Sequence, residues 1–212
     1  MTKEKLSFHD NFYIFLFGCF FGWIIEGIWT YLKKGLLINH SALIIGPFNI
    51  VYGIGALSLT IFLYKLKDKS NFELFCSSFL IGTVLEYTIS FLMEHLVGFV
   101  AWNYSKKPFN INGRVSLQYS IFWGFLGIIW IKLIYPNLKR LIDKFNKTES
   151  IKIMKITIVF LIFNSLLTLG AINRGKEYEK NIPPSNKLEE IYDEYFGIDY
   201  LNNMFNNRWN KK

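Results

Sequence analysis

Charged residues are scarce in this sequence. Asp, Glu, Lys and Arg together make up 19% of its 212 residues, whereas hydrophobic residues make up 51%. Soluble domains carry about 25% charged residues, and the apolar residues here come in long blocks rather than in alternation with polar ones. A folded domain of this size could not hide such blocks from water. The scarcity of charge therefore excludes an ordinary soluble domain and predicts an integral membrane protein.

Residues and motifs that mark common metal and enzyme sites are also few. The two cysteines, Cys19 and Cys76, both lie inside apolar blocks and have no partner at metal-ligand spacing. The three histidines form no helical pair, and the sequence has no Walker A, Gly-x-Ser-x-Gly or His-Glu-x-x-His motif. We therefore expect no metal, no cofactor and no ATP site within the chain, and an enzyme is the less favoured class.

Five apolar blocks are long enough to cross a membrane, because a spanning helix needs about 20 mostly apolar residues. We place them at Asn11–Tyr31, Ala42–Tyr64, Phe72–Val97, Val115–Ile134 and Ile151–Ile172. These blocks are much longer than the roughly ten-residue strands of a membrane β-barrel. In lipid, their backbone N–H and C=O groups must then form hydrogen bonds within helices. The sequence predicts an all-α integral membrane bundle of about five transmembrane helices over residues 1–172.

The formal net charge of +8 comes from Lys and Arg that lie between the apolar blocks and at the chain ends. A nucleic-acid-binding protein would gather such residues on one folded face, so the expected anionic partner is the headgroup layer of the lipid bilayer and not a nucleic acid. Lys and Arg are more frequent before the first block, after the second and before the fifth than in the other segments. By the positive-inside rule, this excess places the N-terminus inside.

Residues 173–212 form a polar tail that is rich in Lys, Glu, Asn and Tyr. Pro183 and Pro184 predict an extended break in the chain. Between Lys187 and Phe196, apolar residues then recur at helical spacing opposite a face of acidic residues. We expect a short amphipathic helix that lies on the membrane surface or caps the bundle.

Glu26 is the one charged residue within the first block, and it follows Gly18 and Gly22 at steps of four residues. The three residues therefore share one helix face. Glycines at this spacing let another helix approach closely, which directs Glu26 into the bundle. A charge at mid-membrane costs roughly 2.5–3.5 kcal/mol on insertion scales and by default marks a functional site. The alternative is a neutral or paired glutamate that only fixes helix packing.

The third block repeats this pattern, with Gly82, Glu86 and Glu94 on one stripe. In the expected topology, Glu86 and Glu94 lie toward the same membrane face as Glu26. Arg114 follows the loop that leaves the third block, and a guanidinium can bind a carboxylate through two parallel hydrogen bonds. We predict that Arg114 pairs with Glu94 or Glu86. The alternative is that Arg114 only anchors its helix at the headgroups.

Two other blocks carry small or polar residues at helical spacing. They are Ser116, Ser120, Gly124 and Gly127 in the fourth block, and Asn164 and Thr168 in the fifth. Each set alone is typical of packing between membrane helices. Together they indicate a bundle with a polar interior.

Several short motifs occur in a fixed order along residues 10–140. They are Gly22-Trp23-Ile24-Ile25-Glu26, Gly46-Pro47-Phe48, Val51-Tyr52-Gly53, Leu85-Glu86-Tyr87, Met93-Glu94, Trp102-Asn103-Tyr104-Ser105, Asn110-Ile111-Asn112-Gly113-Arg114 and Trp123-Gly124. In these motifs the chain resembles the bacterial CmpB-like permeases, the type IV ABC-transporter family. It departs from the family in one motif, because Asn103 stands where the family commonly has Asp.

The resemblance implies a transporter permease in the bacterial plasma membrane, with a separate ATPase subunit as a possible partner. Of the inner segments, only Tyr135–Ser150 is long enough to hold a helix that docks an ATPase. We predict a permease component that binds a small polar or charged solute in the outer half of the bundle. The residues expected at that site are Glu26, Glu86, Glu94, Arg114, Tyr52, Trp102 and Tyr104.

Two other functions stay open at this point. An intramembrane enzyme could use a buried glutamate as an acid or base on a lipid-linked substrate, because burial raises the pKa of a carboxyl group toward the useful range. In a scaffold or sensor without turnover, the acids would only serve as hydrogen-bond partners for one another.

Overall fold

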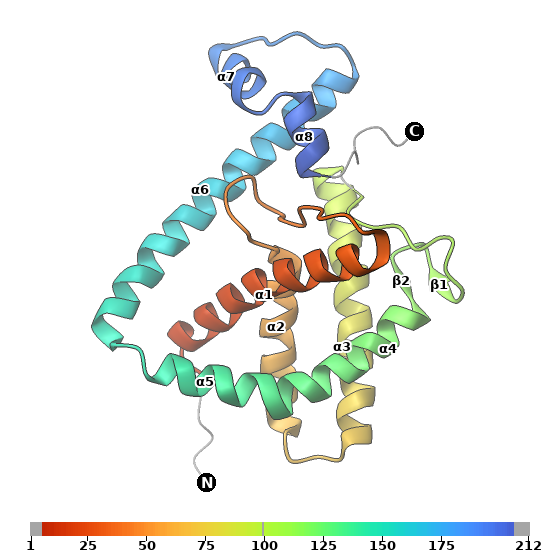
Figure 1. Cartoon of the computed structure of the whole chain (residues 1–212), viewed down its shortest axis with the longest axis vertical. Coiled ribbons are helices and arrows are strands. Elements are labelled where there is room, and N and C mark those ends of the chain that lie inside the picture. The colour runs from red at the N-terminus through yellow and green to blue at the C-terminus, as the bar shows by residue number, and fades with distance from the viewer. Residues whose placement is uncertain (1–5, 99, 206–212) are drawn as a thin grey trace. The chain divides into compact units, whose positions relative to one another are not determined.

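A computed structural model describes residues 6–98 and 100–205, which are mostly helical (Figure 1). The α-helices are α1 (Phe8–Lys34), α2 (Ile50–Leu63), α3 (Asn71–Leu92), α4 (Leu117–Ile129), α5 (Tyr135–Asp143), α6 (Lys147–Glu179), α7 (Lys187–Tyr195) and α8 (Ile198–Met204). Helix α2 continues as a 3₁₀ turn (Tyr64–Leu66), α3 continues as a π turn (Met93–Val97), and a second π turn (Trp130–Ile134) joins α4 to α5. The strands β1 (Asn110–Ile111) and β2 (Val115–Ser116) form an antiparallel hairpin.

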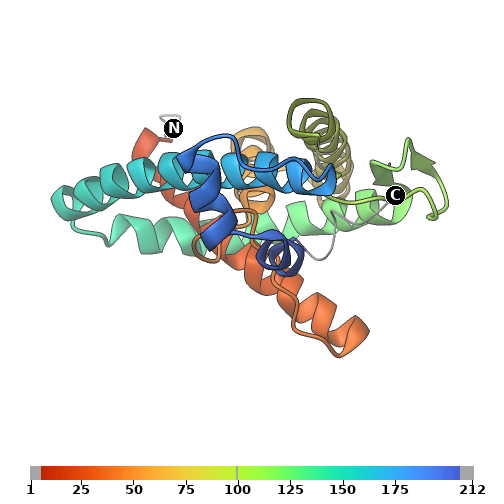
Figure 2. The ribbon, with the colours of Figure 1, turned by 90° about the horizontal axis from the view of Figure 1, so that it is seen from above.

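Within the described residues, four helices are long and apolar enough to cross a membrane. They are Phe8–Lys34, Asn71–Val97, Leu117–Asp143 and Lys147–Glu179. Helix α6 alone has 33 residues, and Figures 1 and 2 both show it without a break. Together with the shorter apolar helix Ile50–Leu66, these helices confirm the predicted all-α membrane class with about five apolar helices.

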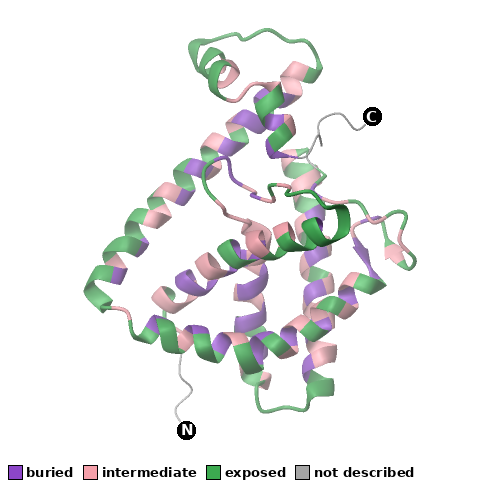
Figure 3. Ribbon diagram, viewed as in Figure 1, coloured by how far each residue is buried: buried purple, intermediate pink, exposed green. Residues whose placement is uncertain are grey.

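Large apolar side chains remain exposed along these helices, and Figure 3 marks many positions of α6 as exposed. The side chains of Ile153, Ile156, Val159, Ile162, Phe163, Leu166 and Leu169 lie between 47% and 70% exposed. A continuous apolar face of this kind exceeds the patches that soluble monomers present to water. Lipid is the environment that such a surface fits.

The predicted second span, Ala42–Tyr64, has the wrong start, because the chain is helical only from Ile50. Residues 39–49 form an irregular segment instead. Gly46 takes a left-handed conformation with φ of 82°, and Pro47 has no N–H for a helical hydrogen bond. The Ser41 hydroxyl lies within hydrogen-bond distance of the carbonyl oxygens of Leu43 (2.8 Å) and Gly46 (2.7 Å).

Two buried side chains of α6 complete the hydrogen bonding of the irregular segment. The Asn164 side chain accepts from the Ile45 N–H at 3.1 Å and donates to the Ile45 carbonyl at 2.7 Å. The Thr168 hydroxyl oxygen accepts from the Ile44 N–H at 3.1 Å. Irregular backbone at membrane depth is tolerated only where it is buried in protein or lines a wet cavity. The polar residues predicted in the fifth block therefore stabilise a broken span.

The inner segment Tyr135–Ser150, which the sequence showed to be long enough for a helix, is largely helical. Helix α4 continues through the π turn into α5, which buries Tyr135, Leu138 and Ile142. Lys139 of α5 forms an ion pair with Asp10 at the start of α1, with 3.7 Å between Nζ and Oδ2. Because of this ion pair, α5 and the start of α1 lie at the same end of the structure.

The chain divides into two compact units. One comprises residues up to Gly18 together with Val51–Lys152, and the other comprises Cys19–Ile50 together with residues from Ile153 onward. In the first unit, α3 and α4 pack through small residues, because Gly82 faces Trp123, Gly124 faces Phe75 and Gly127 faces Ser78. The Thr83 hydroxyl also donates to the Ser120 hydroxyl at 2.7 Å. The small residues predicted on the fourth block are thus a helix-packing face.

Candidate functional site

The stripe predicted on α3 faces the interior of the first unit. Gly82, Glu86 and Ser90 are buried, and Glu86 is 8% exposed. Val84, which lies on the other side of the same helix, is 64% exposed. A helix that exposes valine and buries glutamate keeps the acid away from lipid, in agreement with the cost of an ionisable group in the hydrocarbon layer.

The chain after α3 returns as the β1–β2 hairpin, with Asn112 and Gly113 in the turn. Both residues have positive φ values, 52° and 68°. The Arg114 N–H donates to the Ile111 carbonyl at 3.0 Å and closes the turn. Asn-Gly is the residue pair that such hairpin turns prefer, because both central residues need positive φ. This dipeptide is the signal from which the hairpin could have been predicted.

Two hydrogen bonds fasten the hairpin to the loop that precedes it. Trp102 Nε1 donates to the Arg114 carbonyl at 2.8 Å. The Tyr104 N–H donates to the Gly113 carbonyl at 2.7 Å. The predicted site residues Trp102 and Arg114 therefore belong to one folded loop.

Asn103 shapes the same loop through its side-chain oxygen. That oxygen accepts from the Ser105 N–H at 2.8 Å, and a Cβ built on Gly113 would lie 2.9 Å from it. A carboxylate oxygen can accept the same hydrogen bond from a backbone two residues ahead. Asn103 thus supplies the turn-forming acceptor that an aspartate would supply at this position.

Tyr104 connects this loop to the buried acid of α3. Its hydroxyl donates to Glu86 Oε1 at 2.9 Å. Its ring stacks on Tyr119 of α4, with the ring centroids 4.4 Å apart and the planes 16° from parallel. The Tyr104 hydroxyl therefore gives the buried Glu86 carboxyl group a hydrogen-bond partner.

Arg114 forms an ion pair with Glu94 through Nη1 and Oε2, which confirms the predicted pairing. Of the two acids considered, Glu94 takes this position. The guanidinium also lies over the rings of Phe91 and Tyr87, at 5.5 Å and 5.8 Å from their centroids. The Arg114 side chain is 14% exposed and that of Glu94 is 42% exposed. The pair is therefore open to solvent on the side of the acid.

We call Glu86, Glu94, Trp102, Tyr104 and Arg114 the polar cluster. It combines a buried acid, a half-exposed acid and a guanidinium. Arg114 Nε is buried and has no hydrogen-bond partner among the described residues. A buried donor without a partner costs about 1–3 kcal/mol, and more when the group is charged. The Arg114 guanidinium therefore has hydrogen-bonding capacity that its contacts with the described residues do not use.

The other two predicted site residues lie outside these contacts. Tyr52 is half-buried on α2, and its carbonyl oxygen would lie 2.9 Å from a Cβ built on Gly18 of α1. Gly18 therefore allows the close helix approach that its spacing predicted. Glu26 is half-buried on the part of α1 that belongs to the second unit. A role in solute binding remains a prediction for both side chains.

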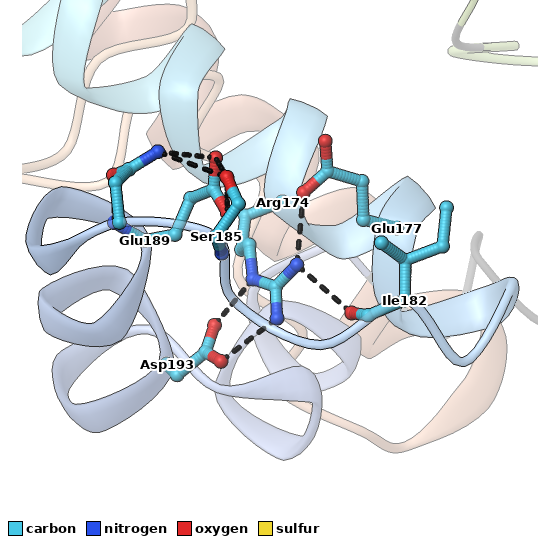
Figure 4. Close-up of polar contacts among 7 residues, drawn as sticks. Arg174, Glu177, Ile182, Ser185, Glu189 and Asp193 are labelled. Carbon is cyan, nitrogen blue, oxygen red and sulfur yellow. Dashed lines mark hydrogen bonds and ion pairs between the residues drawn. The ribbon is translucent and has the colours of Figure 1, made fainter.

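A second charged cluster, which the sequence interpretation missed, lies where α6 meets the tail (Figure 4). Arg174 is 2% exposed, and its Nε and Nη2 donate to both carboxylate oxygens of Asp193 at 2.6 and 2.9 Å. Its Nη1 donates to Glu177 at 2.8 Å and to the Ile182 carbonyl at 3.1 Å. The hydrogen bonds from Arg174 hold the pKa of Asp193 below its ordinary value. In the sequence, only the acidic face of the predicted tail helix indicated a partner for Arg174.

The comparisons with known proteins concern the polar cluster and not the cluster around Arg174. No curated protein and no solved structure is significantly similar to the chain. One family model matches residues 13–169, a range that includes the whole polar cluster, Tyr52 and Glu26 but not Arg174. Because this match covers more than half of the sequence, the chain belongs to the membrane-protein family described as "Putative ABC-transporter type IV".

Proposed function

We propose that the chain is the membrane-spanning component of a transporter and that the polar cluster binds a small polar or charged solute. The observation that carries this proposal is the convergence of two acids, one guanidinium and two aromatic side chains at one end of α3. Charged groups inside membrane helices are expensive and usually belong to solute pathways. Tyr52, which belongs to the same unit as the polar cluster, and Glu26, which belongs to the other unit, are each proposed as further solute-binding residues.

The partners inside the polar cluster suggest how a solute would bind. The Arg114–Glu94 pair is half-exposed on the glutamate side, and exposed ion pairs contribute only about 0–1 kcal/mol. A solute carboxylate could replace Glu94 at the guanidinium, and a solute amine or hydroxyl could bind the acids. A solute that carries both kinds of group would keep both protein charges paired during binding and release.

Energy for transport would come from a separate ATPase subunit, as in other transporters of the ABC type. We place the start of α1 and α5 on the cytoplasmic side of a bacterial plasma membrane, following the excess of Lys and Arg there. Helix α5 buries one face and exposes Pro136, Asn137 and Arg140 on the other. That exposed face is the proposed docking surface for the ATPase.

Uptake measurements on Glu86→Gln test the proposal. Cells expressing the chain and its ATPase partner would be supplied with labelled amino acids, carboxylates and amines. For a solute whose uptake depends on the chain, we expect Glu86→Gln to lower uptake about 10-fold or more, since a hydrogen bond to a charged group contributes about 1.5–3 kcal/mol. Val84→Ala, on the exposed side of the same helix, is the matched control and should leave uptake unchanged. Equal uptake by Glu86→Gln and the wild-type chain would remove this acid from the mechanism.

A further inference from the structure

The irregular segment 39–49 of the second unit borders an open groove that shares no lining residue with the polar cluster. The groove has a volume of about 570 Å³, within the range of small-molecule sites. Its walls include Trp23 of α1, Asn39, Ile44 and Pro47 of the irregular segment, and Tyr200 and Asn203 of α8. All of these residues belong to one unit, so the groove is formed within a single compact body.

The irregular segment, which forms one wall of the groove, is held in place by hydrogen bonds. Asn164 and Thr168 fix the backbone at Ile44 and Ile45, and the Ser41 hydroxyl joins the two ends of the same turn. In transporters, unwound backbone near the middle of the membrane commonly lines solute sites. Because this wall is ordered before binding, a ligand does not have to order it, which reduces the entropic cost of binding.

Helix α8 forms the opposite wall and is bound to the same segment. The Asn39 side chain donates to the Met204 sulfur at 3.0 Å, and the Tyr200 hydroxyl approaches the Ile44 carbonyl at 3.4 Å. Leu201 and Met204 are buried. Only Phe196 and Gly197 separate α8 from α7, which the buried Arg174–Asp193 contact ties to α6. This contact therefore positions the wall.

The lining of the groove decides what kind of molecule fits it. The residues that line it within the described chain carry no formal charge, and two of them, Trp23 and Tyr200, present aromatic rings. Asn203 adds a side-chain amide to the lining. The Asn39 amide already accepts from Trp23 Nε1 and the Ser41 N–H and donates to the Met204 sulfur. An ionised ligand would lose part of its hydration there without gaining a counter-charge, which is unfavourable. A neutral ring can bury its faces and still form hydrogen bonds at its edge.

We propose that this groove binds an uncharged, ring-bearing small molecule and is a second ligand site, separate in its residues and chemistry from the charged solute site. Helix α8 forms one wall of that site, and the Arg174–Asp193 contact holds this wall in place. The proposal does not depend on transport through the polar cluster, because it uses none of that cluster's residues.

Binding of three indole compounds to the full chain in lipid nanodiscs tests this inference. Indole is neutral, indole-3-acetate carries a negative charge and tryptamine carries a positive charge. We expect saturable binding of indole by equilibrium dialysis, with empty nanodiscs subtracted, and at least about 10-fold weaker binding of both charged compounds. Tyr200→Ala should weaken indole binding about five-fold through the lost ring contact. Tyr200→Phe keeps the ring and should stay within about two-fold of the wild-type chain.

Tyr195→Ala is the matched control, because Tyr195 is exposed on α7 and does not line the groove. It should bind indole as the wild-type chain does. Asp193→Asn, which loosens the contact with Arg174, should weaken indole binding although residue 193 does not touch the groove. The inference is overturned by an absence of saturable indole binding, by equal binding of the charged compounds, or by equal effects of Tyr200→Ala and Tyr195→Ala.

Discussion

Gly82→Leu is expected to abolish folding of the first unit. A Cβ at this position would collide with the Cβ, Cγ and Cδ2 atoms of Trp123. Those atoms form the stem of the tryptophan side chain, which cannot swing away as the far end of a flexible side chain could. Overpacking of a close-packed interior costs about 1–3 kcal/mol even when neighbours can adjust, and here α3 and α4 would have to separate. We expect no monodisperse protein on gel filtration in detergent.

Gly27→Leu is the control for this prediction. It introduces the same side chain at a helical glycine, but a Cβ built on Gly27 of α1 has no neighbouring atom within 4 Å. We expect this variant to be purified in normal yield, with a thermal midpoint close to that of the wild-type protein. If both variants fold equally well, the close contact between α3 and α4 does not hold the first unit together.

Asn164→Leu is expected to release the irregular segment from α6. The substitution removes both hydrogen bonds of the Ile45 backbone, and each buried polar group left unsatisfied costs about 1–3 kcal/mol. Leucine has a similar size, so the loss is mainly one of hydrogen bonding. We expect faster amide hydrogen exchange in a peptide covering residues 39–49 and a lower thermal midpoint.

Asn173→Leu separates this effect from a general response of α6 to leucine. Asn173 is exposed on the same helix, and its replacement should leave exchange in residues 39–49 unchanged. Unchanged protection of this peptide in Asn164→Leu would mean that α6 does not stabilise the broken span.

The membrane class and most of the span positions could be predicted from the sequence, because long apolar blocks have few other stable environments. The pairing of Arg114 with an acid of α3 could also be predicted, but the sequence left Glu86 and Glu94 as alternatives, and the structure shows Glu94 as the partner. Gly18 and the small residues of α4 were recognisable because close helix approach needs small side chains at fixed spacing. In each case, a local pattern determines the structure.

The broken second span could not be found from hydropathy. Residues 42–48 are almost entirely apolar, and only the left-handed Gly46 and the following Pro47 interrupt the helix. The partners that make the break tolerable, Asn164 and Thr168, lie more than a hundred residues away in the sequence. The Arg174–Asp193 contact likewise depends on how the tail folds back on α6, which no local pattern specifies.

The central claim is that the polar cluster around Glu86 takes up its solute from water and not from lipid. Cysteine labelling tests it in intact cells, after Cys19→Ser and Cys76→Ser remove the native thiols. A membrane-impermeant maleimide added from outside should label Glu86→Cys, because a wet site lets the thiol ionise and react. It should not label Val84→Cys, whose side chain occupies the apolar outer face. Labelling at position 84 with none at position 86 would contradict the account.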